Sequence, residues 1–386
     1  MNRPPGTERA SDSTAAELDL RMMRRALQLA QRVLYRTSPN PRVGCVLVRD
    51  GRVLAEGATE EAGSRHAEAV ALAEALHRGV DVRGATAYVT LEPCSHHGRT
   101  PPCADALVDA GVARVVAAAR DPNPLVDGGG LQRLRDAGVH VECGLLENES
   151  RELNLGFFSR IERGRPWLRL KAASSLDGIT ALPNGASQWI TGPAARADAH
   201  HWRARACAVL TGIGTVRDDD PRLDVRHVAT SRQPWRVVVD SRLELSPQAR
   251  LLRHGDASRV IVAHALAPAE AARRGAELLG LGVQLLAVPT DADKAGKVDL
   301  RELMHLLAQR QIGELHVEAG ARLNASLLGA GVVDELLVYQ APLLLGQGAG
   351  IGPFGPLQAP SEGLRLHRVE VQAIGADYRW RGRLGA

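Results

Sequence analysis

The sequence predicts an α/β protein made of two domains. The chain has 386 residues, well above the ~150 residues expected of one domain. Short apolar runs alternate with amphipathic stretches along most of its length, as strands alternate with helices in α/β folds. This pattern lapses once, at 162–166, where the sequence reads Glu-Arg-Gly-Arg-Pro. We therefore place the domains at 19–163 and 166–386.

The first domain shows a helix, a hairpin and then alternating elements. The polar segment 1–18 has no apolar signal core, and we interpret it as a disordered leader. Apolar side chains recur every three or four residues over 19–36, which predicts an amphipathic helix. Runs at 43–48 and 53–55 flank an Asp-Gly turn, which indicates a hairpin. Helices are then expected at 66–77, 103–110 and 131–137, and strands at 85–91, 112–119 and 139–143. This alternation favours a sheet covered on both faces.

The second domain repeats the alternation over a longer stretch. Strands are expected at 167–173, 206–211, 235–240, 259–263, 283–288 and 314–318. Helices are expected at 193–204, 268–279, 299–310 and 323–329. The tail, 364–373 and 377–383, indicates an antiparallel hairpin around Gly-Ala-Asp.

Composition excludes several classes of protein. Lys and Arg number 48 against 44 Asp and Glu, a net charge of +4, and no basic run indicates nucleic-acid binding. No stretch approaches the ~18 apolar residues of a membrane helix. Five cysteines do not make a disulfide scaffold, so we expect a reducing cytoplasm. Cys45, Cys143 and Cys207 are expected to be buried small residues.

Three residues of the first domain have the types and order of a catalytic zinc site. His66 begins a predicted helix, Cys94 follows a predicted strand, and Cys103 opens the next helix. They supply three ligands and leave a fourth tetrahedral position for water, which is typical of a catalytic site. Zinc lowers the pKa of bound water to about 7. Glu68, two residues after the histidine, would carry the water proton to a departing amine.

His-x-Glu followed by Pro-Cys and a second Cys is the signature of zinc nucleobase deaminases. In that signature two residues separate the cysteines, whereas residues 95–102 separate them here. The residues alone leave two alternatives open. Either the three side chains are unrelated, or they form a structural zinc site in which His96 or His97 is the fourth ligand.

Longer motifs make the chain similar to a known family, the bifunctional riboflavin-biosynthesis deaminase–reductases. The motifs that resemble it are Pro-Asn-Pro-Arg-Val-Gly at 39–44, His-Ala-Glu at 66–68, the run 93–103, Ser-Leu-Asp-Gly at 175–178, and the runs 187–191, 218–221 and 318–320. The insert between the cysteines is that family's form of the zinc motif. The resemblance covers about residues 19–380 in the family's order.

The resemblance implies a fold, two reactions and two cofactors. A cytidine-deaminase-like α/β/α domain would precede a dihydrofolate-reductase-like α/β domain, with zinc and NADPH as cofactors. The first would release the 2-amino group of 2,5-diamino-6-(5-phosphoribosylamino)pyrimidin-4(3H)-one as ammonia. The second would reduce the ribosyl side chain of the product to ribityl phosphate. A homo-dimer or homo-tetramer is also implied, with a small-molecule substrate and no nucleic-acid or membrane partner.

The second domain has no Gly-x-Gly-x-x-Gly after its first strand, which disfavours a Rossmann site. Residues 318–326 instead place a turn between a predicted strand and a predicted helix, where free backbone N–H groups can meet a pyrophosphate. The family turn usually carries a proline after the glycine, and Ala321 stands there in this chain.

Position by position, the resemblance implies which residues of the reductase domain bind. The cofactor positions are Ala173, Trp189, Thr215, Asp219, Gly320, Ala321, Arg322, Leu323, Asn324, Ala325 and Ser326. The substrate positions are Ser187, Arg203, Leu223, Arg226 and Glu318. Arg203 and Arg226 suit a phosphate, because a planar guanidinium makes bidentate, charge-assisted bonds.

Four further residues have two interpretations each. Asn40 hydrogen-bonds the base or ribose, or it is a turn residue. His96 and Arg99 face the substrate phosphate, or they are solvated. Lys171, one of only three lysines, contacts the substrate or is a surface lysine with a buried stem.

Two other functions compete with this hypothesis. A deaminase of tRNA or free nucleosides would predict a basic face and the short Cys-x-x-Cys spacing. A non-enzymatic zinc-stabilised module would predict a fourth protein ligand and leaves the second α/β domain unexplained.

Overall fold

The computed structural model describes residues 7–95, 101–124 and 126–385. The chain divides into two compact units, Met1–Glu162 and Arg163–Ala386. The division falls in the segment where the apolar pattern of the sequence lapses. No helix in the described part of the chain is long and apolar enough to cross a membrane.

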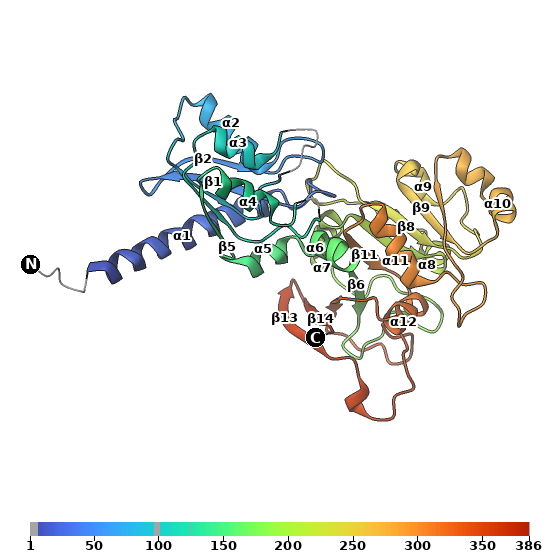
Figure 1. Ribbon diagram of the computed structural model, residues 1–386. Helices are drawn as coiled ribbons and strands as arrows, with labels where there is room; N and C mark the ends of the chain where they lie inside the picture. The colour runs from blue at the N-terminus through green and yellow to red at the C-terminus, as the bar shows by residue number, and fades with distance from the viewer. Residues whose placement is uncertain (1–6, 96–100, 125, 386) are drawn as a thin grey trace, which may run out of the picture. The chain divides into compact units, whose positions relative to one another are not determined.

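The first unit contains six helices and five strands within its described residues (Figure 1). They are α1 (Thr7–Arg32), β1 (Gly44–Arg49), β2 (Arg52–Ala58), α2 (Ala67–His77), β3 (Thr86–Val89), α3 (Cys103–Asp109), β4 (Arg114–Ala117), α4 (Gly129–Asp136), β5 (His140–Cys143), α5 (Glu147–Leu153) and α6 (Leu155–Arg163), whose last residue opens the second unit.

Helix α1 begins at Thr7, so the leader interpretation is wrong for residues 7–18. The sequence from Thr7 to Leu18 contains no glycine or proline, and nothing in it stops the helix from continuing toward the N-terminus. A polar composition is therefore compatible with a helix in this segment.

The sheet of the first unit has the order β2-β1-β3-β4-β5. Strand β1 is antiparallel to β2 and β3, and β3, β4 and β5 are parallel. Apolar side chains of α2, α3 and α4 pack on one face, and those of α1 pack on the other. This is the covered sheet expected from the alternation. Cys143 is exposed, contrary to expectation, because it ends the edge strand β5; Cys45 and Cys207 are buried.

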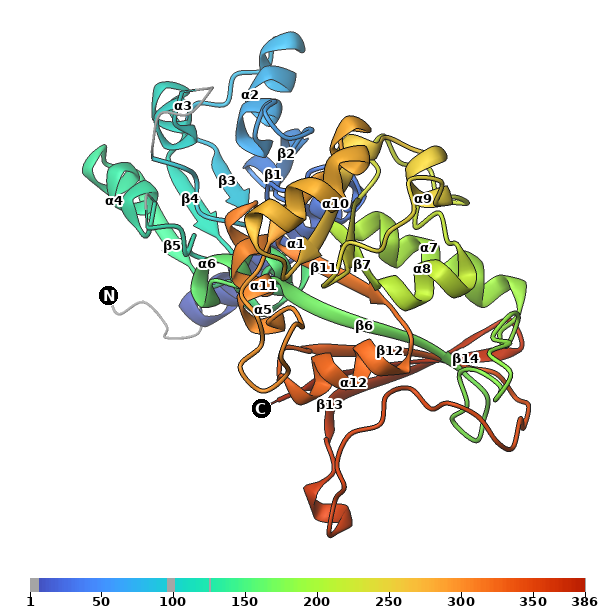
Figure 2. The ribbon, with the colours of Figure 1, turned by 90° about the vertical axis from the view of Figure 1, so that its right-hand side faces the viewer.

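The second unit carries a larger sheet (Figure 2). Its strands are β6 (Trp167–Ser174), β7 (Ala208–Gly212), β8 (Trp235–Val239), β9 (Val260–His264), β10 (Gln284–Ala287), β11 (Glu314–Glu318), β12 (Glu335–Gln340), β13 (Leu366–Ile374) and β14 (Asp377–Leu384). Its helices are α7 (Pro193–Arg205), α8 (Ile213–Asp219), α9 (Arg250–Arg253), α10 (Pro268–Gly280), α11 (Leu300–Gln309) and α12 (Ala321–Gly329), with short 3₁₀ turns at Ala257–Arg259 and Pro360–Glu362.

The strand order is β10-β9-β8-β7-β11-β6-β12-β14-β13. All neighbours are parallel except β12–β14 and β13–β14, so the tail is the antiparallel hairpin that the sequence indicated. Helices α11 and α12 pack on one face of the sheet, and α7 packs on the other.

Helices α5, α6, α8 and α9 and strand β12 were not predicted. Helices α8 and α9 have seven and four residues, too few for the 3.6-residue period to be visible in a sequence. Strand β12 alternates between buried and half-buried residues, but its sequence is Glu-Leu-Leu-Val-Tyr-Gln, and the buried Glu335 hides the alternation.

Candidate functional site

His66, Cys94 and Cys103 meet at one point in the first unit. Cys103 Sγ lies 3.4 Å and Cys94 Sγ 3.6 Å from His66 Nδ1. The three ligand atoms all lie within 4.8 Å of one another. His66 directly precedes α2, and Cys103 is the first residue of α3, so two helix N-termini bring these side chains together.

This arrangement fits a zinc ion. Zn–S bonds of about 2.3 Å and Zn–N bonds of about 2.0 Å, set at tetrahedral angles, require an S···N separation of roughly 3.5 Å. The hydrogen bond from the Cys103 thiol lowers the pKa of Cys94 to about 4, and the same bond raises the pKa of Cys103. Cysteine binds a metal ion as the thiolate, so a bound dication would displace the thiol proton.

Glu68 lies in the first turn of α2 beside this cluster, with only 3% of its surface exposed. Burial, followed by the charge of the Cys94 thiolate, raises the pKa of Glu68 to about 7. A carboxyl group whose pKa is near neutrality can both accept and return a proton. The structure therefore places a carboxyl group with a near-neutral pKa beside three side chains that could hold a metal ion.

A buried carboxylate holds the segment that carries Cys94. Glu92 accepts hydrogen bonds from four backbone N–H groups at 2.9–3.1 Å. Those of Asp121 and Gly128 precede α4, and those of Gly130 and Leu131 lie in its first turn. Sequence reasoning missed Glu92. Its position two residues before a ligand, at the end of an apolar strand, was the available signal.

Gly130 allows the first turn of α4 to approach the segment that carries Cys94. A Cβ atom on Gly130 would lie 1.8 Å from the carbonyl oxygen of Pro93, the residue before Cys94. Asp121 is buried, and burial raises its pKa to about 6. Asp121 also lacked a sequence prediction, although it opens an Asp-Pro-Asn-Pro turn at a strand end.

The loop that carries Asn40 is fixed by its neighbours. The Asn40 N–H donates to the Thr37 carbonyl at 2.9 Å, so the turn interpretation of Asn40 holds for its backbone. Arg42 is buried and donates to the carbonyls of Leu34 and Leu153 at 3.1 and 2.9 Å. His96 and Arg99 lie outside the described residues.

In the second unit, the implied cofactor and substrate positions gather at the carboxyl ends of neighbouring parallel strands. Ala173 lies near the end of β6, Thr215 follows β7 in α8, and Glu318 ends β11. Strand β11 runs between β7 and β6. In open α/β sheets, ligands bind at the carboxyl ends of such strands.

The turn after β11 fits a pyrophosphate. Helix α12 begins at Ala321, so the missing proline does not prevent the helix, and Gly320 caps it without a side-chain hydrogen bond. The Gly320 N–H donates to Thr215 Oγ1 at 3.1 Å, which joins α8 to this turn. The remaining first-turn N–H groups of α12 point toward its N-terminal end, as a phosphate requires.

The side chains of the turn from Gly320 to Ser326 make different contacts. Asn324 is buried and donates to the carbonyls of Ala319 and Ile351 at 3.2 and 2.8 Å, while its buried Oδ1 has no partner in the described residues. Ser326 Oγ donates to the Arg322 carbonyl at 3.1 Å. Leu323 packs against Gly212 at the end of β7. Asn324 is therefore the side chain of this group that retains an unused acceptor.

Three other implied residues lie on the surface of the same unit. Asp219 Oδ1 lies 3.5 Å from Ser187 Oγ and 3.4 Å from Gln188 Nε2. The Trp189 side chain is 69% exposed, and the guanidinium of Arg196 lies 4.5 Å from its ring centroid. An exposed indole beside a cationic side chain is available to a planar ligand.

Arg203, Glu318 and Lys171 form a charged cluster between α7 and the sheet. Arg203 donates from Nε and Nη2 to the two carboxylate oxygens of Glu318, and Lys171 lies opposite Glu318 in the register of β6 and β11. Burial would raise the pKa of Glu318, but Arg203 outweighs it and holds this pKa well below its usual range. Burial lowers the pKa of Lys171. By its exposed surface Lys171 is half-buried.

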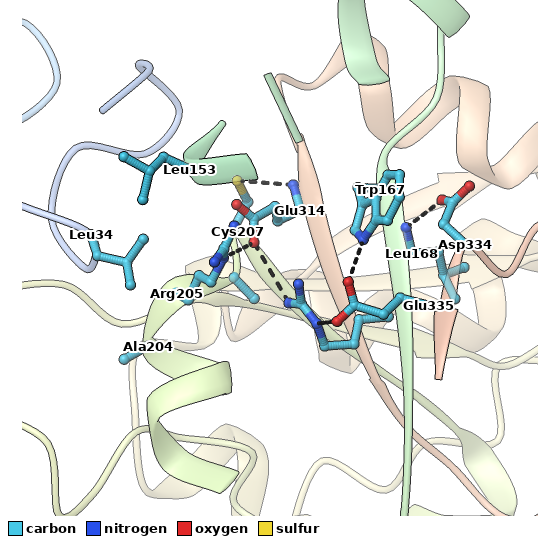
Figure 3. Close-up of polar contacts among 12 residues, drawn as sticks. Leu34, Leu153, Trp167, Leu168, Ala204, Arg205, Cys207, Glu314, Asp334 and Glu335 are labelled. Carbon is cyan, nitrogen blue, oxygen red and sulfur yellow. Dashed lines mark hydrogen bonds and ion pairs between the residues drawn. The ribbon is translucent and has the colours of Figure 1, made fainter. Parts of the chain in front are cut away.

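A buried ionic network below this cluster fixes α7 against the sheet (Figure 3). Arg205, the last residue of α7, donates to Glu314 on β11 at 2.8 Å. Arg169 lies between Glu314 and Glu335, at 3.6 and 2.6 Å. Because these carboxylates are almost fully buried, the register of α7 on β11 is fixed, and Arg203 is positioned with it.

The segment with Leu223 and Arg226 lies beside α7. Leu223 is 2% exposed, so its side chain faces the protein and its backbone is what a ligand can reach. The Arg226 guanidinium is 41% exposed and pairs with Asp224. Arg226 is thus the exposed cation of this segment.

Comparisons with known proteins agree with both halves of this description. Residues 166–379 match the family described as RibD C-terminal domain, and residues 16–119 match the cytidine and deoxycytidylate deaminase zinc-binding region.

Relatives match nearly the whole chain. The riboflavin biosynthesis protein RibD of Escherichia coli K12 is 45% identical over 92% of this chain and 96% of its own length. The RibD of Aquifex aeolicus is 40% identical over 94% of this chain and 97% of its own length.

Solved structures match as well. Acinetobacter baumannii RibD superimposes with a TM-score of 0.86 at 42% identity, covering 96% of this chain and 99% of that one. A diaminohydroxyphosphoribosylaminopyrimidine deaminase/5-amino-6-(5-phosphoribosylamino)uracil reductase of Thermotoga maritima superimposes with a TM-score of 0.82 at 33% identity. The match covers 96% of this chain and 99% of that one. The chain therefore belongs to the RibD family, the bifunctional deaminase–reductases of riboflavin biosynthesis, with a zinc-dependent deaminase domain followed by an NADPH-dependent reductase domain.

Proposed function

We propose specific roles for the residues of the two sites. The observation that carries the deaminase assignment is the convergence of His66 Nδ1 and two cysteine sulfurs beside the buried Glu68. His66, Cys94 and Cys103 would hold the zinc. When bound, this ion lowers the pKa of a water molecule and makes it a nucleophile near neutral pH.

Glu68 moves protons in the deaminase site. Its burial keeps its pKa about 7, so the carboxylate can take one proton from the nucleophilic water and pass it to the ring nitrogen. It then takes the second proton of the same oxygen and passes it to the amine, which leaves as ammonia as the C–N bond breaks and the carbonyl forms. The first turn of α4, held by Glu92, packs directly on Pro93 and would support the segment with Cys94. Asn40 would orient the base or the ribose from the neighbouring loop.

In the reductase site, the turn from Gly320 to Ser326 and residues Ala173, Trp189, Thr215 and Asp219 would hold NADPH. The cofactor supplies the hydride, so the protein needs no nucleophile and acts by placing the nicotinamide against the substrate. The first-turn N–H groups of α12 suit the pyrophosphate.

The substrate would lie beside α7 and the segment around Arg226, which contact each other directly. Arg226 would bind the phosphate, since its guanidinium is exposed. Glu318, Lys171 and Arg203 would face the ribosyl side chain that is reduced, with Ser187 and Leu223 beside it. Three donor nitrogens of Arg203 already have protein acceptors, so Arg203 orients Glu318 more than it binds phosphate.

The cellular compartment and the partners of the enzyme are proposed from its cysteines and from the family resemblance. The five cysteines form no disulfide, as in a reducing cytoplasm. We expect a small-molecule substrate, no nucleic-acid partner and a homo-oligomer, the last from the family resemblance alone.

Two variants of the full chain test the deaminase roles. Glu68→Gln is expected to keep one zinc per chain and to lose about 10²- to 10⁴-fold in ammonia release. Cys103→Ala is expected to lose both zinc and ammonia release. Cys143→Ser, an exposed cysteine of the same unit, is the control and should change neither. Full deaminase activity in Glu68→Gln, or full zinc content in Cys103→Ala, would reject the assigned role.

A further inference from the structure

The segment 223–227 of the reductase domain is held in an unfavourable backbone conformation. Leu223 at its start has φ +55° and His227 at its end has φ +62°. Both values lie in the left-handed region, which costs non-glycine residues free energy and persists only where neighbouring contacts impose it. The residues between them include Arg226, and other side chains must therefore fix this segment.

Three side chains provide those contacts. Arg203 Nη1 donates to the Asp224 carbonyl at 2.9 Å. Gln233 accepts from the Val225 N–H at 2.7 Å and donates to the Val225 carbonyl at 3.2 Å. The third contact belongs to His200, on α7.

His200 accepts a hydrogen bond from the backbone N–H of Arg226 at its Nδ1 atom, at a distance of 3.0 Å. The His200 side chain is 5% exposed, and its ring meets that of His227 edge to face, with centroids 5.0 Å apart. Since His200 precedes Arg203 by three residues on α7, both side chains lie on the same side of the helix. Both hold the 223–227 segment by hydrogen bonds.

We propose that His200 is a positioning residue of the reductase substrate site, holding Arg226 where its guanidinium meets the substrate phosphate. The imidazole acts as a neutral acceptor, so its proton resides on Nε2. This inference rests on the proposed role of Arg226. It assigns to His200 no contact with substrate or cofactor.

The structure also accounts for the neutral state of this imidazole. Burial, then the charges of Arg203 and Arg226, lower the pKa of His200 to about 4, with Glu318 opposing and His227 adding to the effect. These are the charged and titratable groups that face His200 from α7, from the 223–227 segment and from β11. At neutral pH the acceptor is therefore available.

The test measures reductase kinetics of the full chain on the deaminated intermediate. His200→Leu removes the acceptor and should raise the KM for the intermediate about tenfold, as expected when a buried N–H loses its partner. The kcat and the KM for NADPH should stay within about twofold. Ammonia release by the deaminase domain reports that the chain is folded.

Two further variants separate positioning from packing. His200→Asn places an amide oxygen close to the position of Nδ1 and should restore the KM to within about threefold of the wild type. His201→Leu, an exposed neighbour on α7, should leave all constants unchanged. If His200→Asn behaves like His200→Leu, or if kcat and both KM values change together, the inference is overturned.

Arg226→Ala distinguishes this inference from the proposed function beneath it. A large rise in the KM for the intermediate in Arg226→Ala, without any rise in His200→Leu, overturns the role of His200 alone. No rise in Arg226→Ala overturns the substrate role of Arg226, and the role of His200 with it.

Discussion

Arg203 and Glu318 form a two-pronged ion pair between α7 and the end of β11. Arg203 Nη2 lies 2.8 Å from Glu318 Oε2, and Nε donates to Oε1. Both side chains are 14% exposed. A third donor of Arg203, Nη1, holds the Asp224 carbonyl, so one guanidinium connects a helix, a strand end and the segment that carries Arg226.

Arg203→Lys tests this geometry. A lysine keeps the charge, but it cannot meet both carboxylate oxygens and the Asp224 carbonyl at once. We expect kcat/KM for reduction of the deaminated intermediate to fall about 10- to 100-fold, equal to about 1.4–2.8 kcal/mol. Steady-state assays of NADPH oxidation measure this, with the exposed Arg273→Lys as control. An Arg203→Lys enzyme with wild-type constants would show that the two-pronged contact has no role.

Removal of zinc should abolish the deaminase activity and leave the reductase activity. The ligands and Glu68 all belong to the first unit, whereas the reductase positions belong to the second. A chelator is expected to abolish ammonia release and to leave NADPH oxidation on the deaminated intermediate within about twofold; added zinc should restore the first activity. Equal loss of both activities on chelation would contradict separate sites.

Gly130→Ala tests the support of the zinc-binding segment. The added Cβ would meet the Pro93 carbonyl at 1.8 Å, so the first turn of α4 or the segment with Cys94 must move. Overpacking of this kind costs about 1–3 kcal/mol. We expect weaker zinc retention during dialysis against a competing chelator.

Gly129→Ala is the matched control for that experiment. Its Cβ would lie 3.0 Å from Ser95 Oγ, a side-chain atom that can rotate away. If Gly129→Ala and Gly130→Ala release zinc at the same rate as the wild type, the close approach to Pro93 does not control the metal site.

The stability of the protein should fall with pH between 6.5 and 4, in part because of His200. Its pKa is about 4 in the folded chain and 6.5 in the reference state, so the unfolded chain binds an additional proton in this window. The contribution is fully present above pH 6.5 and is lost as the pH falls, by about 1–2 kcal/mol after allowance for partial solvation. Urea unfolding of the wild type and His200→Asn measures it. Identical pH slopes in the two proteins would exclude the effect.

The sequence predicted much of the fold because most elements are long enough to show their period. Both α/β domains, the opening hairpin and the closing β13–β14 hairpin follow from apolar spacing and turn residues. Short elements such as α8 and α9 do not show a period. Strand β12 was missed for a different reason: Glu335 at its start is buried, and tertiary partners that include Arg169 and Arg381 make that burial acceptable.

The site was predictable where residue type fixes chemistry. His66, Cys94, Cys103 and Glu68 could be chosen from type and order, and the structure brings them together. His200 and Gln233 could not, because each acts by a hydrogen bond to the backbone of another segment, which leaves no signature in the sequence. Such contacts become visible only when the loops are folded.

The central claim is that one chain performs two consecutive reactions at two sites. It is tested most directly by supplying the diaminopyrimidine ribosyl phosphate to the full chain and following ammonia release and NADPH oxidation together. The wild type should release ammonia before it oxidises NADPH. Glu68→Gln should do neither with this substrate, yet oxidise NADPH normally when it is given the deaminated intermediate. Rapid NADPH oxidation by Glu68→Gln on the diamino substrate would contradict the account.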